Sequence, residues 1–131
     1  KDLNIFDAQG ISFTPEIIEN PYYNLIAVAW KLDNTHLDAL KKINLIAINA
    51  AENYRTRSVL LTSNSAQDAE NLTKEAQLMV EIFYADAVPL KSMVRSNPGL
   101  ILMKNGMVIK KWPASQLPSY DELEKNYFSK N

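Results

Sequence analysis

The chain's single histidine lies between two aspartates. These three side chains are the ones whose types and spacing could support acid–base chemistry or metal binding. His36 follows Asp33 by three residues and precedes Asp38 by two. An imidazole beside a carboxylate can serve as a general base or as a metal ligand. One histidine without other candidate ligands does not make a convincing metal site, so we expect no metal and no other cofactor. Two interpretations of His36 stay open: an acid–base pair with Asp33, or a solvated residue at the start of a helix.

The rest of the composition excludes several other kinds of chemistry. The chain has no cysteine, so disulfides, thiolate metal sites and thiol catalysis are excluded together. No serine has a histidine and an acid at a spacing that supports nucleophilic catalysis. The three glycines, at positions 10, 99 and 106, form no phosphate-binding loop. A net charge of −1 gives no general attraction to nucleic acid.

The length of 131 residues indicates a single domain, residues 1–131. The longest apolar run, Leu25–Trp30, is far shorter than the ~20 residues that span a bilayer. Because the chain begins at Lys1 and not at methionine, we expect it to be either a processed product or a fragment of a longer protein, in which a membrane anchor could precede it.

Strand and helix patterns alternate along the chain and predict an α/β fold with a mostly parallel sheet. The expected strands are 25–30, 58–62, 80–84, 100–104 and 107–112, after an N-terminal hairpin extension over residues 1–13. The pair Asn105-Gly106 predicts a tight turn that joins the last two strands. These closing strands should add antiparallel pairs, which makes the central sheet mixed and flanked by helices.

Capping residues predict where the helices begin. The expected starts are Thr14, Thr35 (with Asp38), Ser65 (with Asp68), Asp86 and Ser119 (with Glu122). Residues 45–48 could form a separate strand, but the helical period continues through them, so we favour one helix to about Asn53. The following helix should present Ala69, Leu72, Ala76 and Met79 on one face.

Two segments carry a resemblance to a known fold family. Leu25–His36 reads as a buried strand, an aromatic residue and a helix start, and Arg95–Gly106 reads as a proline loop, an apolar strand and a tight turn. This order resembles the thioredoxin-like fold in its peroxiredoxin-like variant with an N-terminal hairpin. Where that family carries its CxxC dithiol, this chain has Leu32 and Thr35, or Asp33 and His36.

A finer resemblance rests on the amino-acid sequences of two segments. Residues 3–18 and the stretch RSNPGLILMKNGMVIKKW, residues 95–112, are similar to the soluble C-terminal domain of DoxX-like membrane proteins of Bacteroidetes-type bacteria. Those domains often lack the dithiol. The resemblance implies a transmembrane segment upstream of Lys1 and a domain tethered to the bacterial inner membrane, on a side that we do not assign.

The proline loop gives a second candidate site. The resemblance implies a cis peptide bond before Pro98, although Asn-Pro-Gly is also a common trans turn. In this family the loop can pair with an extended peptide. Trp30, Asp33, Asn97 and Pro98 would then line a groove for a protein or peptide partner. Lys104, Lys110 and Lys111 around the hairpin either face anionic lipid or protect an edge strand from aggregation.

Three functional hypotheses follow. The favoured one is a redox-inactive thioredoxin-like module with a binding or structural role. A second is a non-thiol enzyme that uses Asp33 and His36, in a pocket between them and Asn97. A third is a peptide-binding, chaperone-like domain that acts beside Pro98.

Overall fold

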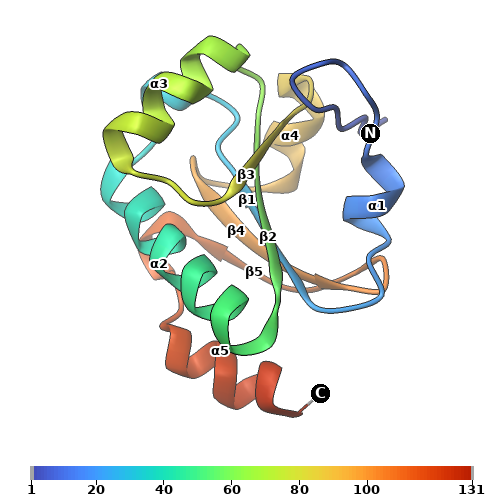
Figure 1. The fold of residues 1–131 in the computed structure, drawn as a ribbon, viewed down its shortest axis with the longest axis vertical. Helices are drawn as coiled ribbons and strands as arrows, with labels where there is room; N and C mark the ends of the chain where they lie inside the picture. Colours follow the sequence, from blue (N-terminus) through green and yellow to red (C-terminus); the bar gives the residue numbers. More distant parts are fainter. Residues whose placement is uncertain (1, 131) are drawn as a thin grey trace.

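The computed structural model describes residues 2–130, which form a five-stranded sheet between two layers of helices (Figure 1). The strands are β1 (Asn24–Val28), β2 (Arg57–Thr62), β3 (Glu81–Tyr84), β4 (Gly99–Lys104) and β5 (Met107–Pro113). Their order in the sheet is β3-β2-β1-β4-β5. β1 pairs in parallel with β2, and β2 with β3, whereas the β1–β4 and β4–β5 pairs are antiparallel. The mixed sheet is confirmed, and only half of its pairings are parallel.

Five α-helices and three 3₁₀ turns complete the described part of the chain. They are α1 (Thr14–Ile18), α2 (Leu37–Tyr54), α3 (Ala66–Ala76), α4 (Ala87–Met93), α5 (Tyr120–Asn126), η1 (Leu32–Asn34), η2 (Ala114–Gln116) and η3 (Phe128–Lys130). The favoured single helix over residues 45–48 is confirmed, because these residues lie within α2.

The central strand β1 is buried along its whole length, as expected for a strand that is apolar on both faces. Successive strand residues point to opposite faces of a sheet. Leu25 and Ala27 therefore join a core that α2, α3 and α5 cover. Ile26 and Val28 join a second core beneath α1 and α4. Figure 1 shows these helices on the two sides of the sheet.

The N-terminal segment extends the sheet at β3. Phe6 bridges Ser12 within the segment and also Tyr84 at the end of β3. The Phe6 amide donates to the Tyr84 carbonyl at 2.9 Å, and the Tyr84 amide donates back at 2.8 Å. The predicted hairpin is thus reduced to one bridge, and it caps the end of an otherwise exposed edge strand.

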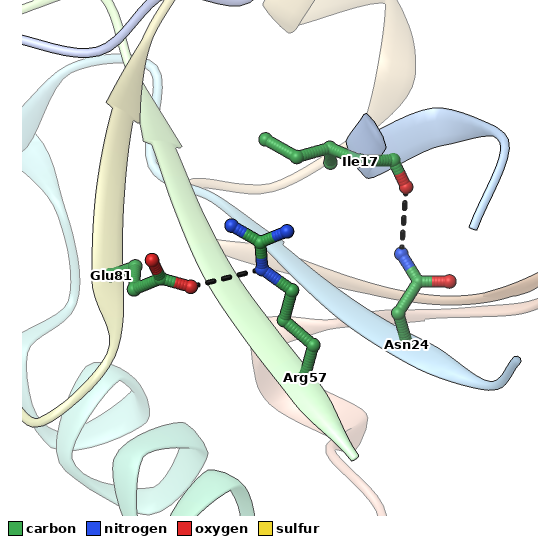
Figure 2. Close-up of polar contacts among 4 residues, drawn as sticks. All are labelled: Ile17, Asn24, Arg57 and Glu81. Atoms are coloured by element: carbon green, nitrogen blue, oxygen red, sulfur yellow. Dashed lines mark hydrogen bonds and ion pairs between the residues drawn. The ribbon is translucent and has the colours of Figure 1, made fainter. Parts of the chain in front are cut away.

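One polar contact joins α1 to β1, and another joins the neighbouring strands β2 and β3 (Figure 2). The Asn24 side-chain amide at the start of β1 donates to the Ile17 carbonyl of α1 at 3.1 Å. Arg57 of β2 donates through Nε to Glu81 of β3 at 2.9 Å, and its guanidinium lies 5.7 Å from the Phe83 ring centroid. Both contacts lie at the edge where the parallel strands begin.

Two of the predicted helix caps are confirmed. The Ser65 hydroxyl accepts from the Asp68 amide at 3.2 Å. Ser119 and Glu122 form a reciprocal capping box at the start of α5, with bonds of 3.1 and 3.0 Å. Both sites have a serine followed three residues later by an acidic residue, the pattern that satisfies the unpaired amides of a first turn.

Two other predicted caps are wrong, because neither Thr14 nor Thr35 is the N-cap residue of its helix. Thr14 is the first residue of α1, and its hydroxyl accepts from the Ile5 amide at 2.8 Å, which ties the helix to the N-terminal segment. The N-cap of α2 is His36 and not Thr35. Asp86 does occupy the N-cap of α4, but its side chain makes no capping hydrogen bond.

The helix after β2 ends earlier than its apolar period predicts. Gln77 adopts a left-handed conformation, with φ of 55°, which ends α3 at Ala76. The buried Asn44 side chain then donates to the Gln77 carbonyl at 3.2 Å and accepts from the Met79 amide at 2.8 Å. Met79 therefore lies outside the helix and is 74% exposed, so its assignment to the inner helical face is wrong.

Gly99 should not tolerate a side chain. A Cβ atom at this first residue of β4 would lie 2.5 Å from Cγ1 of Val94. We expect Gly99→Ala to lower the free energy of unfolding by about 1–2 kcal/mol, because a β-branched valine cannot move aside freely. Urea denaturation would measure the loss. Gly99→Ala should lower the free energy of unfolding by less in the Val94→Ala variant than in the wild-type protein. An equal loss in the two proteins would contradict this explanation.

Candidate functional site

The loop that follows β1 begins at Trp30, which is half-buried beside the end of β2. Its carbonyl accepts from the Ser63 amide at 3.3 Å and also from the Ser63 hydroxyl. The ammonium group of Lys91, on α4, lies 4.7 Å from the centroid of the Trp30 ring, a cation–π distance. The Trp30 backbone is therefore bonded to the residue that follows β2, while its indole ring contacts Lys91 of α4.

The next residues form a closed turn directly before α2. Leu32 is buried, and its amide donates to the Asn64 side chain at 2.9 Å. The Thr35 amide donates to the Leu32 carbonyl at 3.3 Å, which brings the two residues three positions apart close together. His36 follows as the N-cap of α2, in an extended conformation and without a capping side-chain bond.

The proline loop lies against this turn. The Asn97–Pro98 peptide bond is cis. The Asn97 side-chain amide donates to the Lys31 carbonyl at 2.7 Å, and the Asn97 carbonyl accepts from the His36 amide at 3.3 Å. Asn97 therefore bonds to the residues on either side of the Leu32–Thr35 turn, Lys31 and His36.

Ser96 fixes the other side of the proline loop. Its hydroxyl donates to the Pro98 carbonyl at 2.7 Å and accepts from the Ala114 amide at 2.9 Å. The loop is thus joined to the segment after β1 on one side and to the segment after β5 on the other.

These bonds use backbone groups that an extended ligand would need. The Asn97 carbonyl and the His36 amide pair with each other. Two buried side-chain oxygens at the site, Oδ1 of Asn97 and Oγ1 of Thr35, have no hydrogen-bond partner within residues 2–130. Buried polar atoms usually have a hydrogen-bond partner, so these two oxygens are exceptions at this site.

Asp33 and His36 line different hollows on the surface. Asp33 lines one with Asn64, Asp68 and Glu75, whereas His36 lines another with residues of α2 and η2. Neither hollow includes Asn97. The acid–base hypothesis requires one pocket between Asp33, His36 and Asn97, and this arrangement counts against it. Within the part of the chain that the structure describes, no group of three or more His, Asp or Glu residues is placed to hold a metal.

The sequence interpretation missed the residues that hold this site together. They are Ser63, Asn64, Lys91 and Ser96. A signal for Ser63 and Asn64 was present, because they follow the strand that pairs in parallel with β1. The carboxyl ends of neighbouring parallel strands meet at one edge of a sheet, where ligand and loop contacts gather.

Comparison with known proteins identifies the fold. No protein-family profile and no curated protein sequence matches the chain. Solved structures do match over nearly the whole length of both chains. The exposed lipoprotein thioredoxin of Streptococcus pneumoniae is 16% identical, with a TM-score of 0.66 over 96% of this chain and 97% of that one. A thiol-disulfide oxidoreductase from Bacteroides fragilis is 10% identical, with a TM-score of 0.70 over 94% and 95%. Yeast Sco1 is 12% identical, with a TM-score of 0.70 over 97% and 96%.

The fold is thioredoxin-like. Identities of 10–16% show the fold alone, and two of these neighbours are named as redox proteins, whereas this chain contains no cysteine. The turn at Leu32–Thr35 and the cis-proline loop occupy the places that the resemblance in sequence implied. The thioredoxin-like scaffold is therefore present without the sulfur atoms of its usual chemistry.

Proposed function

We propose that this domain is a redox-inactive thioredoxin-like module with a binding or structural role. The observation that carries the proposal is the turn before α2. Its two closely spaced residues, Leu32 and Thr35, carry no sulfur, and Asn97 bonds the segment to the proline loop at both ends. A site built to exchange disulfides needs a reactive thiolate there. Here hydrogen bonds hold the two loops to each other.

We further propose that the domain is the soluble part of a DoxX-like membrane protein, held at the bacterial inner membrane by a segment that precedes Lys1. The support is the similarity of the amino-acid sequence of residues 3–18 and 95–112 to the soluble domains of those proteins. No helix within residues 2–130 is both long and apolar enough to cross a bilayer.

Cell fractionation tests the proposed tether. An antibody raised against residues 1–131 should detect a membrane protein clearly larger than 14.8 kDa, the mass of this chain. The signal should stay with the membranes after an alkaline carbonate wash, because carbonate releases peripheral proteins and leaves membrane-spanning ones. A signal released by carbonate, or found in the soluble fraction, would contradict the tether.

A further inference from the structure

The charges of this chain are unevenly distributed. Between Asp86 and Asp121 there is no acidic residue, while the same stretch holds five basic ones: Lys91, Arg95, Lys104, Lys110 and Lys111. The rest of the chain has nine basic and fifteen acidic residues. The stretch comprises α4, the proline loop and the β4–β5 hairpin, so one part of an acidic protein is cationic.

Exposed apolar side chains gather at the hairpin in this cationic stretch. Met107, Val108 and Ile109 at the start of β5 are 66%, 50% and 40% exposed. β5 is an edge strand, paired only with β4 in the described sheet. Because successive strand residues point to opposite faces, these side chains lie on both faces of the hairpin. Several large apolar side chains exposed at one hairpin indicate an interaction surface.

A second loop adjoins the hairpin and adds an aromatic residue. The Asn105 amide at the hairpin turn donates to the Asn20 carbonyl at 2.8 Å. Figure 1 shows the orange hairpin tip beside the blue loop that precedes β1. Tyr22 on this loop is 70% exposed. Tyrosine has an apolar ring and a polar tip, which suits the boundary between lipid and water.

Lysines flank the apolar side chains. The ammonium group of Lys104 lies 4.5 Å from the centroid of the Tyr23 ring, so this charge is held beside the loop. Lys110 and Lys111 are exposed and directly follow Ile109, and the Lys111 ammonium donates to the Met93 carbonyl at 2.7 Å. The nearest acidic residues in sequence to this loop are Glu16 and Glu19, on and after α1.

We propose that this hairpin surface, formed by Tyr22, Lys104 and residues 107–111, docks onto an anionic lipid bilayer. The apolar side chains would enter the headgroup region while the lysines contact anionic headgroups, the combination that binds proteins to membrane surfaces. A second copy of the chain fits less well, because a two-fold contact would place the same cationic surface of both copies face to face. The inference goes beyond the proposed function, since it concerns the domain's own surface.

Vesicle co-sedimentation of residues 1–131 tests the inference. The domain should sediment with phosphatidylcholine vesicles that contain phosphatidylglycerol, and not with pure phosphatidylcholine vesicles. Binding should fall at high salt, because the Debye length shortens from about 10 Å at 0.1 M to about 3 Å at 1 M ionic strength. Absence of sedimentation with both vesicle types, or equal sedimentation with both, would overturn the proposal.

To locate the lipid-binding surface, each hairpin variant is compared with a control variant that makes the same kind of substitution elsewhere. K110E/K111E should weaken binding at least tenfold, since each lysine near an anionic surface contributes about fivefold. K41E/K42E, on exposed positions of α2, makes the same change in charge and should weaken it much less.

M107S/V108S should also weaken binding strongly. The matched M79S/V88S alters side chains that are 74% and 76% exposed elsewhere, and it should have little effect. All four variants should keep the wild-type melting temperature within a few degrees, and the apolar pair keeps the test valid if K110E/K111E does not fold. Equal losses within each pair, or a concentration-dependent dimer that the 107–108 substitutions abolish, would overturn the proposal.

Discussion

Replacing Leu32 and Thr35 by cysteine should give a chain that forms a disulfide between these two positions, within the segment that joins β1 to α2. The Thr35 amide already donates to the Leu32 carbonyl at 3.3 Å, so the two residues close a turn. Such a turn places their Cα atoms less than about 7 Å apart, and disulfides span about 4.4–6.8 Å. Air oxidation should therefore reduce the titratable thiols from two per chain to none. Thiol titration under denaturing conditions, with mass spectrometry of the intact chain, would measure this.

Asp33 and His36 provide the matched control, because they have the same spacing in sequence. The His36 amide bonds to the Asn97 carbonyl and not back to Asp33, so no closed turn joins this pair. D33C/H36C should oxidise more slowly than L32C/T35C under the same conditions. Equal rates, or faster oxidation of D33C/H36C, would contradict the geometry of the turn.

Asn97→Asp should destabilise the fold by about 2–4 kcal/mol at pH 7. The Asn97 side-chain nitrogen Nδ2 donates to the Lys31 carbonyl at 2.7 Å, and the side-chain oxygen Oδ1 is buried without a partner within residues 2–130. A carboxylate would face the carbonyl with an acceptor in place of a donor, and part of its charge would be buried. Urea denaturation at constant temperature would measure the loss.

Asn97→Ala separates the lost hydrogen bond from the added charge. It should cost about 1 kcal/mol, because it removes one hydrogen bond and also one unsatisfied oxygen. The cost of Asn97→Asp should shrink as the pH falls, since burial raises the pKa of the new carboxyl above its unfolded value and the neutral acid can donate to Lys31. An aspartate variant as stable as the alanine variant at neutral pH would contradict the role given to this side chain.

The sheet could be predicted because its signals are local and redundant. The uninterrupted apolar run before Trp30 indicates a central strand, and both of its faces are buried in the structure. Asn105-Gly106 demands positive φ at two successive positions, and both residues adopt it, with φ of 58° and 78°. Burial and backbone sterics alone determine these features, so one segment of sequence carries the whole signal.

The helix boundaries show where local signals fail. Thr35 and Asp38 have the spacing of a capping pair, yet the closed turn at Leu32–Asn34 delays α2 until Leu37. That turn is held by Asn64, which lies far away in the sequence. A tertiary contact therefore decides the start of this helix, and no pattern within the segment could reveal it.

The sequence predicts which loops carry the candidate site residues, but not the contacts between those loops. Trp30, Asn97 and Pro98 do lie in the two loops that meet beside the start of α2. The bonds from Asn97 to both Lys31 and His36 depend on side-chain and backbone geometry between distant segments. For the same reason, the separation of Asp33 from His36 into two hollows could not be foreseen from their spacing of three residues.

The rate of thiol–disulfide exchange tests the central claim most directly, namely that a thioredoxin-like scaffold is kept here without its sulfur chemistry. Wild-type protein and oxidised L32C/T35C would be compared in the exchange of a model disulfide with a small thiol. The wild-type rate should equal the rate without protein, and the variant should exceed it, because the scaffold places the restored cysteines at the start of an 18-residue helix. Turnover by the wild type, or a variant that forms its disulfide yet does not accelerate exchange, would contradict the claim.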